Sequence, residues 1–205
     1  MNKTKSILLF LTLIFPVLIY LFLQGFGKNE FDIPVYYEGG ITAPLGDCPQ
    51  LTSNQPYQLN GADLQEILKG SESASQVAVY ELGNKDNEQL RNNLYTFLEK
   101  YKDRSDINLI SVKQLDDTIF SSSRYPSWKR FNLPDSDLMR LGKCILQLNL
   151  NAQMKADSGL VLVDENRRIR GYYDPYELKE IDRLNTELYI LLSKQNSKQL
   201  NKDER

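Results

Sequence analysis

The pattern of apolar and polar positions separates one long apolar segment at the N-terminus from a patterned region that begins near residue 59. Residues 7–23 read ILLFLTLIFPVLIYLFL, and only Thr12 and Pro16 interrupt the run. Extended to Phe26, the run predicts a helix of about 20 residues and ~30 Å, which is long enough to cross a bilayer. Pro16 would kink this helix without excluding it.

The charges on either side of residues 7–26 predict the orientation of this segment. Residues 1–6 carry two lysines and the terminal amine, whereas Lys28 is followed by Glu30 and Asp32. The positive-inside rule places residues 1–6 in the cytoplasm and the C-terminal domain outside it, in the periplasm of a Gram-negative cell. We therefore expect a single-pass anchor of the cytoplasmic membrane, with the lipid bilayer as the partner of residues 7–26. A cleaved signal peptide is the alternative, although its apolar region would be unusually long and no small-x-small site follows it.

Residues 27–58 differ in composition from the segments on either side. They contain one glycine pair and four prolines, Gly39-Gly40, Pro34, Pro44, Pro49 and Pro56. This composition predicts an extended stalk with one short strand at residues 35–37. At the other end of the chain, residues 193–205 are polar and are expected to form a disordered tail.

Between these segments, residues 59–192 predict one α/β domain. Apolar runs and apolar alternation predict strands at residues 76–82, 107–112, 144–150, 160–163 and 168–173. Helical spacing predicts helices at residues 62–68, 88–101, 137–141 and 177–192, and a helical segment at Trp128 within residues 125–131. The clearest helix is 88–101, where five apolar side chains share a face: Leu90, Leu94, Phe97, Leu98 and Tyr101.

Residues 160–174, LVLVDENRRIRGYYD, predict a hairpin, because an apolar run is followed by turn residues and a second alternating run. The order of strand, helix, strand, helical linker, hairpin and helix is that of the thioredoxin arrangement. In it a βαβ half precedes a ββα half, and helices lie on both faces of a central sheet. We therefore predict an α/β, thioredoxin-like fold preceded by a single N-terminal transmembrane helix.

The composition excludes several classes of function. The chain of 205 residues has a formal net charge of −2, and a nucleic-acid partner is not expected without a concentrated basic face. It contains no histidine and only two cysteines, whereas most transition-metal sites and most acid–base catalysis at neutral pH use one of these residues. We assign no catalytic, metal-binding or cofactor-binding residue, and we expect that the chain is not an enzyme.

Three clusters of polar or aromatic residues are interpreted as structural features and not as binding sites. Asp116-Asp117 is interpreted as solvated surface, not as a ligand pair for a hard cation. The arginines of the hairpin are expected to pair locally with Asp164, Glu165 or helix acids in preference to phosphate; they are Arg167, Arg168 and Arg170. The aromatic residues are expected to pack in the core and at its rim in preference to forming a ligand cage; they are Tyr125, Trp128, Phe131, Tyr172, Tyr173 and Tyr176.

The hairpin and the following segment YELKEIDRLNTELYILL resemble the C-terminal part of the SCO/SenC family. Members of this family are membrane-anchored, thioredoxin-fold copper chaperones of cytochrome oxidase assembly. The order of parts agrees too: an anchor, a proline-rich stalk, a strand near Val77, and then a helix and the strand INLISV. The resemblance covers most of residues 77–192, and its specific part is the last 35 or so residues.

The departures from the family pattern decide what the resemblance implies for chemistry. The family holds copper with Cys-x-x-x-Cys just after the first central strand and with a histidine shortly before the late hairpin. Here the first location reads GNKDNEQL, residues 83–90, and the second reads MKADSG, residues 154–159. Neither contains a thiol or an imidazole, and carboxylates and amides do not replace these ligands for Cu(I). Copper binding in the family's manner and thioredoxin-type thiol exchange are therefore not expected.

The remaining chemistry lies in Cys48 and Cys144. A domain outside the cytoplasm meets oxidising conditions, so we expect these two residues to form a structural disulfide. A buried, inert Cys144 with a loose Cys48 is the alternative. We expect a non-catalytic, membrane-tethered, SCO/SenC-like accessory or assembly factor that binds another membrane or extracytoplasmic protein. An atypical thiol-redox or metal-handling protein using both cysteines is the second hypothesis.

Overall fold

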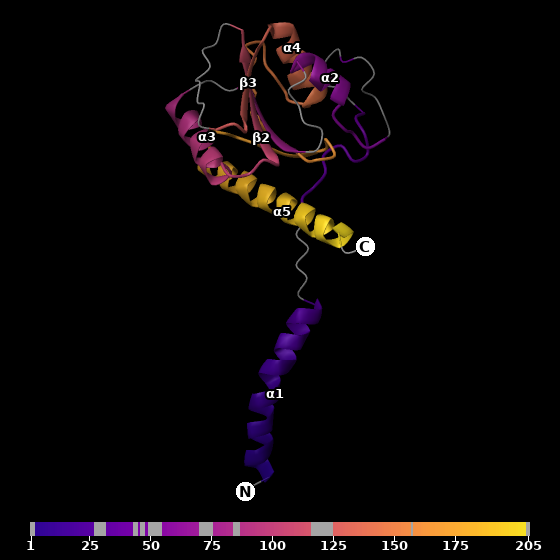
Figure 1. Cartoon of the computed structure of the whole chain (residues 1–205), viewed down its shortest axis with the longest axis vertical. Coiled ribbons are helices and arrows are strands. Elements are labelled where there is room, and N and C mark those ends of the chain that lie inside the picture. The colour runs from indigo at the N-terminus through magenta and orange to yellow at the C-terminus, as the bar shows by residue number, and fades with distance from the viewer. Residues whose placement is uncertain are drawn as a thin grey trace. The chain divides into compact units, whose positions relative to one another are not determined.

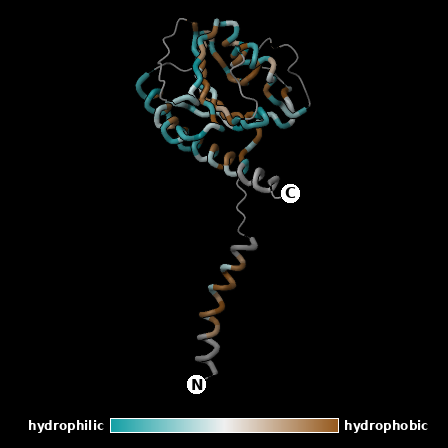
Figure 2. Tube along the Cα trace, viewed as in Figure 1, coloured by the Kyte–Doolittle hydropathy of each residue, from teal (hydrophilic) through white to brown (hydrophobic). Residues whose placement is uncertain are grey.

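The computed structural model describes residues 3–26, 32–42, 45, 48, 55–69, 76–83, 87–115, 125–156 and 158–203. The chain divides into two compact units, Met1–Asp32 and Ile33–Arg205. In the first unit, α1 is a helix of 24 residues, Lys3–Phe26, with Pro16 inside it. Figure 2 shows the apolar residues along this helix. Within the described ranges, no helix has both the length and the apolar content that spanning a membrane requires.

A mixed sheet of 5 strands forms the centre of the second unit, in the order β3-β2-β1-β4-β5. The strands are β1 Val77–Leu82, β2 Ile107–Gln114, β3 Trp128–Leu133, β4 Leu160–Val163 and β5 Ile169–Tyr173. β1 pairs in parallel with β2, and β2 pairs in parallel with β3, whereas β4 is antiparallel to both β1 and β5. The predicted α/β class, with its βαβ half and its late hairpin, is therefore confirmed.

Helices cover both faces of this sheet (Figure 1). α3, Glu88–Lys100, and α5, Leu178–Asp203, lie on one face; α2, Gly61–Ile67, α4, Asp135–Met139, and a π-helix η1, Arg140–Ile145, lie on the other. Successive side chains of a strand point to opposite faces, so β1 contributes to both hydrophobic clusters. Val77 and Val79 belong to the cluster of α3 and α5, whereas Tyr80 and Leu82 belong to the cluster of α2 and η1.

Local sequence explains where α3 begins and which side it buries. The side chain of Asn87 accepts a hydrogen bond from the backbone N–H of Leu90 at 2.8 Å, which caps the first turn. The buried residues of the helix are Leu90, Leu94, Phe97 and Leu98, as the apolar spacing predicts.

Two predicted elements of the domain are wrong. Residues 128–133 form strand β3 instead of a helix, because parallel pairing with β2 satisfies their backbone and Trp128 donates its Nε1–H to Ser111 Oγ at 2.9 Å. Residues 144–150 form no regular strand. They complete η1 and then turn, with Leu146 N–H bonded to Leu141 O at 2.8 Å and Gln147 at φ 52°. The apolar side chains of this run are buried in the hydrophobic cluster of α2 and η1, without the regular strand that the sequence predicted.

The terminal segments also differ from the predictions. The predicted strand at residues 35–37 is absent, since a turn occupies this stretch and Gly40 N–H bonds to Tyr37 O at 3.0 Å. The described parts of the predicted stalk pack against the domain: Ile33 and Ile41 are 4% and 3% exposed. At the C-terminus, α5 continues to Asp203, so the residues predicted to form a disordered tail are helical up to that point.

Candidate functional site

The carboxyl end of β1 brings together two segments that are far apart in the sequence. Ala156 N–H donates to Gly83 O at 3.1 Å, and Leu82 N–H donates to Gly159 O at 2.9 Å. Gly83 has φ 74°, and a Cβ there would lie 2.9 Å from both Met154 O and Ala156 N. Only glycine fits this close approach without strain. In open α/β sheets the carboxyl ends of strands are where ligands bind, which makes this the first candidate site.

Beside this site, the sheet face under α3 carries a polar group inside an apolar surface. Glu81, whose side chain is 1% exposed, accepts a hydrogen bond from Lys113 Nζ at 2.7 Å. The neighbouring Trp128 ring lies under the Arg130 guanidinium, 4.4 Å from its centroid. The lysine balances the charge of the buried carboxylate, so this pair links β1 to β2 across the sheet.

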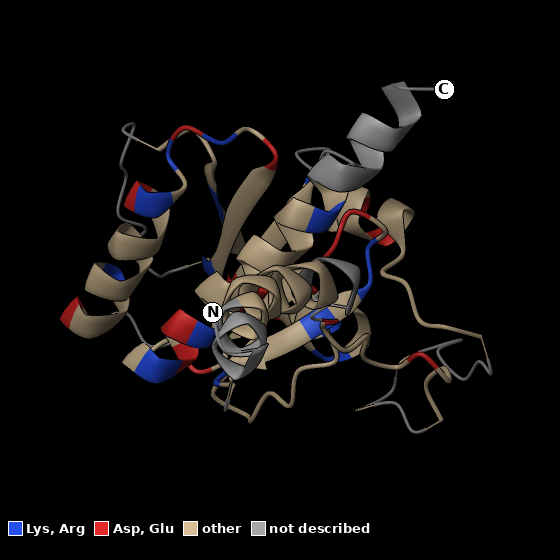
Figure 3. Cartoon of the chain, turned by 90° about the horizontal axis from the view of Figure 1, so that it is seen from below, with Lys and Arg blue, Asp and Glu red and all other residues tan. Residues whose placement is uncertain are grey.

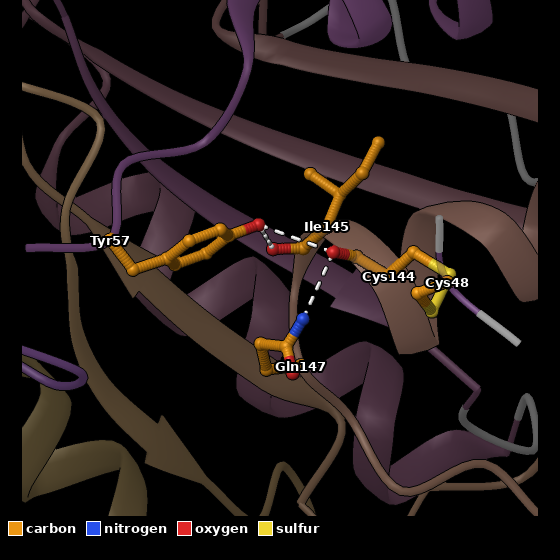
Figure 4. Close-up of a disulfide and its surroundings, with 5 residues drawn as sticks. All are labelled: Cys48, Tyr57, Cys144, Ile145 and Gln147. Carbon is orange, nitrogen blue, oxygen red and sulfur yellow. Dashed lines mark hydrogen bonds between the residues drawn. A yellow bond between two sulfur atoms is a disulfide. The ribbon is translucent and has the colours of Figure 1, made fainter. Parts of the chain in front are cut away.

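The second candidate site is the end of η1, where the structure forms a disulfide between Cys48 and Cys144 (Figure 4). Their Cα atoms are 5.4 Å apart, and the two residues are 96 positions apart in the sequence. The last carbonyls of η1 accept side-chain hydrogen bonds. Tyr57 Oη donates to Ile145 O at 2.7 Å, Gln147 Nε2 donates to Cys144 O at 2.9 Å, and Tyr172 Oη donates to Leu146 O at 2.9 Å.

The tyrosines around η1 form one cluster. The rings of Tyr36 and Tyr172 meet edge-on with centroids 5.1 Å apart, and those of Tyr37 and Tyr57 do so at 6.2 Å. Burial raises the pKa of Tyr57 and of Tyr172 above the ordinary value for a phenol. Both phenols therefore keep their protons and act as hydrogen-bond donors to the η1 carbonyls.

The late hairpin is organised around one buried carboxylate. Asp164, 1% exposed, accepts from the backbone N–H groups of Asn166 and Arg168 and from the side chains of Arg168 and Arg170. Arg170 in turn donates to Ile33 O at 2.5 Å. The expected local pairing of Arg168 and Arg170 with Asp164 is confirmed, and Arg170 joins the hairpin to the beginning of the domain.

No protein-family model and no curated protein matches the sequence. Among solved structures, a SCO1/SenC family lipoprotein from Bacillus anthracis matches 66% of this chain and 92% of its own, with a TM-score of 0.46 and 12% identity. A candidate electron transfer protein from Aquifex aeolicus matches 56% of this chain and 81% of its own, with a TM-score of 0.39 and 12% identity. At this identity the matches concern the fold and carry no activity, ligand or partner to the chain.

The two locations where the SCO/SenC resemblance expects copper ligands are the two segments that meet at the end of β1. They are close in space, and the described residues there offer backbone groups, the cap Asn87 and the thioether of Met154. Both cysteines lie instead in the bridge at η1. At the two locations compared, residues 83–90 and 154–159, the sequence therefore contains no thiol or imidazole.

The remaining residues that the sequence analysis considered as sites lie in different parts of the chain. Tyr125, Trp128 and Tyr173 are buried in the core, as expected for packing residues. Asp116 and Asp117 lie outside the described residues. In the view of Figure 3, acidic and basic residues are interspersed over the domain, without a large region of one sign. Sequence reasoning missed the Glu81–Lys113 pair, although a lone acid inside the apolar strand VAVYEL was a usable signal for it.

Proposed function

We propose that this chain is a non-catalytic, SCO/SenC-like thioredoxin-fold protein, tethered to the cytoplasmic membrane, that assists assembly outside the cytoplasm by binding another protein. One observation carries the proposal: the two segments that meet at the end of β1 contain no thiol or imidazole, while both cysteines are bonded to each other at η1. Without a thiol or imidazole these segments lack the ligands that hold Cu(I) in the family's manner, so the proposal assigns the domain to protein binding.

The disulfide is the observation that favours the second candidate function. A bonded cysteine pair can exchange with thiols, and once reduced it offers two thiolates whose Cα atoms are 5.4 Å apart in the oxidised chain. A thiol-redox or metal-handling role would therefore use Cys48 and Cys144 at η1, away from the end of β1.

Copper titration separates these two functions. We expect the oxidised protein to bind no Cu(I) or Cu(II) tightly enough to survive competition by a chelator, because residues 83–90 and 154–159 contain no thiol or imidazole. The measurement is metal content after chelator competition, in oxidised and in reduced protein.

The matched control is the double variant Cys48→Ser/Cys144→Ser. Copper bound one-to-one by the reduced wild type and lost in the double variant would favour the metal-handling function. Tight copper binding by the oxidised protein would overturn the proposed function altogether.

We propose that residues 7–26 form the membrane tether. Its support is the length of the apolar run, its flanking charges, and the exposed large apolar side chains of α1 between Phe10 and Phe22. We expect the protein to keep its Met1 or Asn2 end, to stay with membranes during carbonate extraction, and to lose its domain to protease added outside the cytoplasmic membrane.

A double variant Leu11→Asp/Leu18→Asp is the matched control for the tether. Each aspartate in the middle of the segment opposes insertion by about 2.5–3.5 kcal/mol, so this variant is expected to appear in the carbonate-soluble fraction. An N-terminus near Gly27, or a wild type released by carbonate, would refute the anchor.

A further inference from the structure

Asn60–Gly61 is the single place in the sequence where glycine follows an asparagine. Glycine has no side chain, so its backbone nitrogen can approach the side-chain amide of the preceding residue more closely than the nitrogen of any other residue. Attack of this nitrogen on the amide carbon is the reaction by which asparagine is lost from proteins, and it makes asparagine a thermolabile residue. Asn60 is exposed and Gly61 is partly exposed, so the junction lies at the surface of the domain.

The structure holds this junction away from the reactive geometry. Asn60 is extended, with φ −69° and ψ 115°, and its side-chain oxygen accepts a hydrogen bond from Ala62 N–H at 3.0 Å. Ring closure requires rotation about the Cα–C bond of Asn60, which brings the Gly61 nitrogen onto Cγ. This rotation breaks the hydrogen bond to Ala62 and moves the chain before residue 60 relative to α2.

Both sides of that rotating bond are fixed to the domain. On the N-terminal side, Leu59 is 1% exposed and donates its N–H to Arg167 O in the turn of the hairpin at 2.8 Å. On the C-terminal side, α2 is anchored by Leu64 and Ile67, which are 0% and 4% exposed in the hydrophobic cluster of α2 and η1. Rotation at Asn60 therefore occurs only after one of these two sides has come away from the domain.

The side chain of Arg167 adds a cover over Gly61. Its guanidinium occupies the place that a Cβ of Gly61 would take, with Nη1 nearest. The same residue thus contacts the junction through its main-chain carbonyl, which is bonded to Leu59, and through its side chain. We call this set of contacts, made by residues 59–62 and Arg167, the α2–hairpin joint. A carboxylate formed at position 60 would lie beside the positive charge of Arg167.

We propose that Asn60 is a deamidation site that the α2–hairpin joint keeps closed, so that opening of the joint is recorded as an irreversible change from an amide to a carboxylate. The Gly61 nitrogen gives its proton to hydroxide and bonds to Asn60 Cγ. The Cγ–Nδ2 bond then breaks, and the amide takes up a proton from water and leaves as ammonia, which regenerates hydroxide. Water opens the resulting succinimide ring, so the sum is water consumed and ammonia released.

The two products of ring opening have different effects on the joint. Opening at Cγ gives aspartate, which keeps the length of the main chain and can still accept the hydrogen bond from Ala62 N–H. Opening at the main-chain carbonyl carbon gives isoaspartate, which adds a methylene to the main chain between residues 60 and 61. With this added length, Leu59 and the first turn of α2 no longer fit their places together, and α2 is loosened from the hairpin.

Peptide mapping of the full chain in detergent, aged at mildly alkaline pH, tests the site. In urea, with the disulfide intact, Asn60 should deamidate before every other asparagine, because it alone precedes glycine. In the native protein the same reaction is expected to be at least about tenfold slower, since hydrogen bonds and packing must open first. Equal rates in the two states would show that the joint does not keep the site closed, and an unchanged Asn60 in urea would eliminate the site.

Variants of Arg167 test the cover over Gly61. Arg167→Ala removes the guanidinium and leaves the carbonyl bonded to Leu59, so native deamidation should be about three- to fivefold faster than in the wild type, with an unchanged rate in urea. Asn166→Ala, at an exposed position of the same turn, is the matched control and should keep the wild-type rate. A wild-type rate in native Arg167→Ala would refute the cover.

Hydrogen exchange on the aged protein tests the loosening of α2. The amides of Leu59 and Leu64 should exchange at least about tenfold faster in the isoaspartate fraction than in unmodified protein, whereas the Asn60→Asp variant should keep the unmodified rates. An isoaspartate fraction that exchanges like the unmodified protein would overturn this consequence. These measurements need neither copper nor a binding partner, so the deamidation site and the proposed function succeed or fail independently.

Discussion

Replacing Asp164 with asparagine is expected to lower the free energy of unfolding by about 3–5 kcal/mol, because it removes one member of a buried ion pair. The carboxylate is 1% exposed and lies 3.1 Å from Arg170 Nη1, and the Arg170 side chain is itself 6% exposed. An asparagine of the same size still accepts hydrogen bonds from the turn backbone, but it removes the negative charge that faces this buried guanidinium.

The measurement is equilibrium denaturation in urea, with the midpoint and the slope compared with those of the wild type. Glu165→Gln, a neutralising change one residue further along the same turn at a partly exposed position, is the matched control, and its effect should stay within about 0.5 kcal/mol. A loss below about 1 kcal/mol in Asp164→Asn, with an unchanged slope, would show that the pair does not stabilise the hairpin as argued.

Removing the bridge is the other change with a large expected effect. Cys48→Ser is expected to cost about 4–5 kcal/mol, since the bond joins residues 96 positions apart and restricts the unfolded chain accordingly. The fold should persist, because the strands of the sheet and most residues of both hydrophobic clusters follow residue 60 in the chain.

Denaturation of Cys48→Ser, Cys144→Ser and the double variant should give the same stability, equal to that of the reduced wild type. The far-ultraviolet circular dichroism should be unchanged in all of them. Equal stability of the oxidised and reduced wild type would contradict the entropic argument. A single variant much less stable than the double variant would indicate that the remaining thiol, and not the missing bond, causes the loss.

Local sequence was sufficient wherever an element is stabilised by residues close together in the chain. The hairpin follows from an apolar run and an Asp-Glu-Asn turn, whose first carboxylate accepts hydrogen bonds from within the same turn. Helix α3 follows from its apolar spacing and its Asn87 cap. The missing copper ligands also needed no structure, because the absence of histidine is a property of composition.

The errors have a common physical cause, which is pairing or packing between distant segments. Trp128 lies in a strand because β2 was available to pair with it, and no periodicity within residues 125–131 could indicate that neighbour. Residues 144–150 are largely apolar because they are packed in the interior at the end of a π-helix. A buried strand would have the same apolar sequence, so the pattern alone does not distinguish the two.

By itself, the sequence determined the α/β class, the hairpin, α3 and the absence of histidine, because propensity, periodicity and composition are local quantities. It also named the two cysteines that form the bridge. Only the tertiary structure decided that Gly83 meets residues 154–156, that Glu81 pairs with Lys113, and that Tyr36 and Cys48 of the predicted stalk are bonded to β5 and η1. These contacts join residues far apart in the chain, and their free energy depends on distances that folding alone establishes.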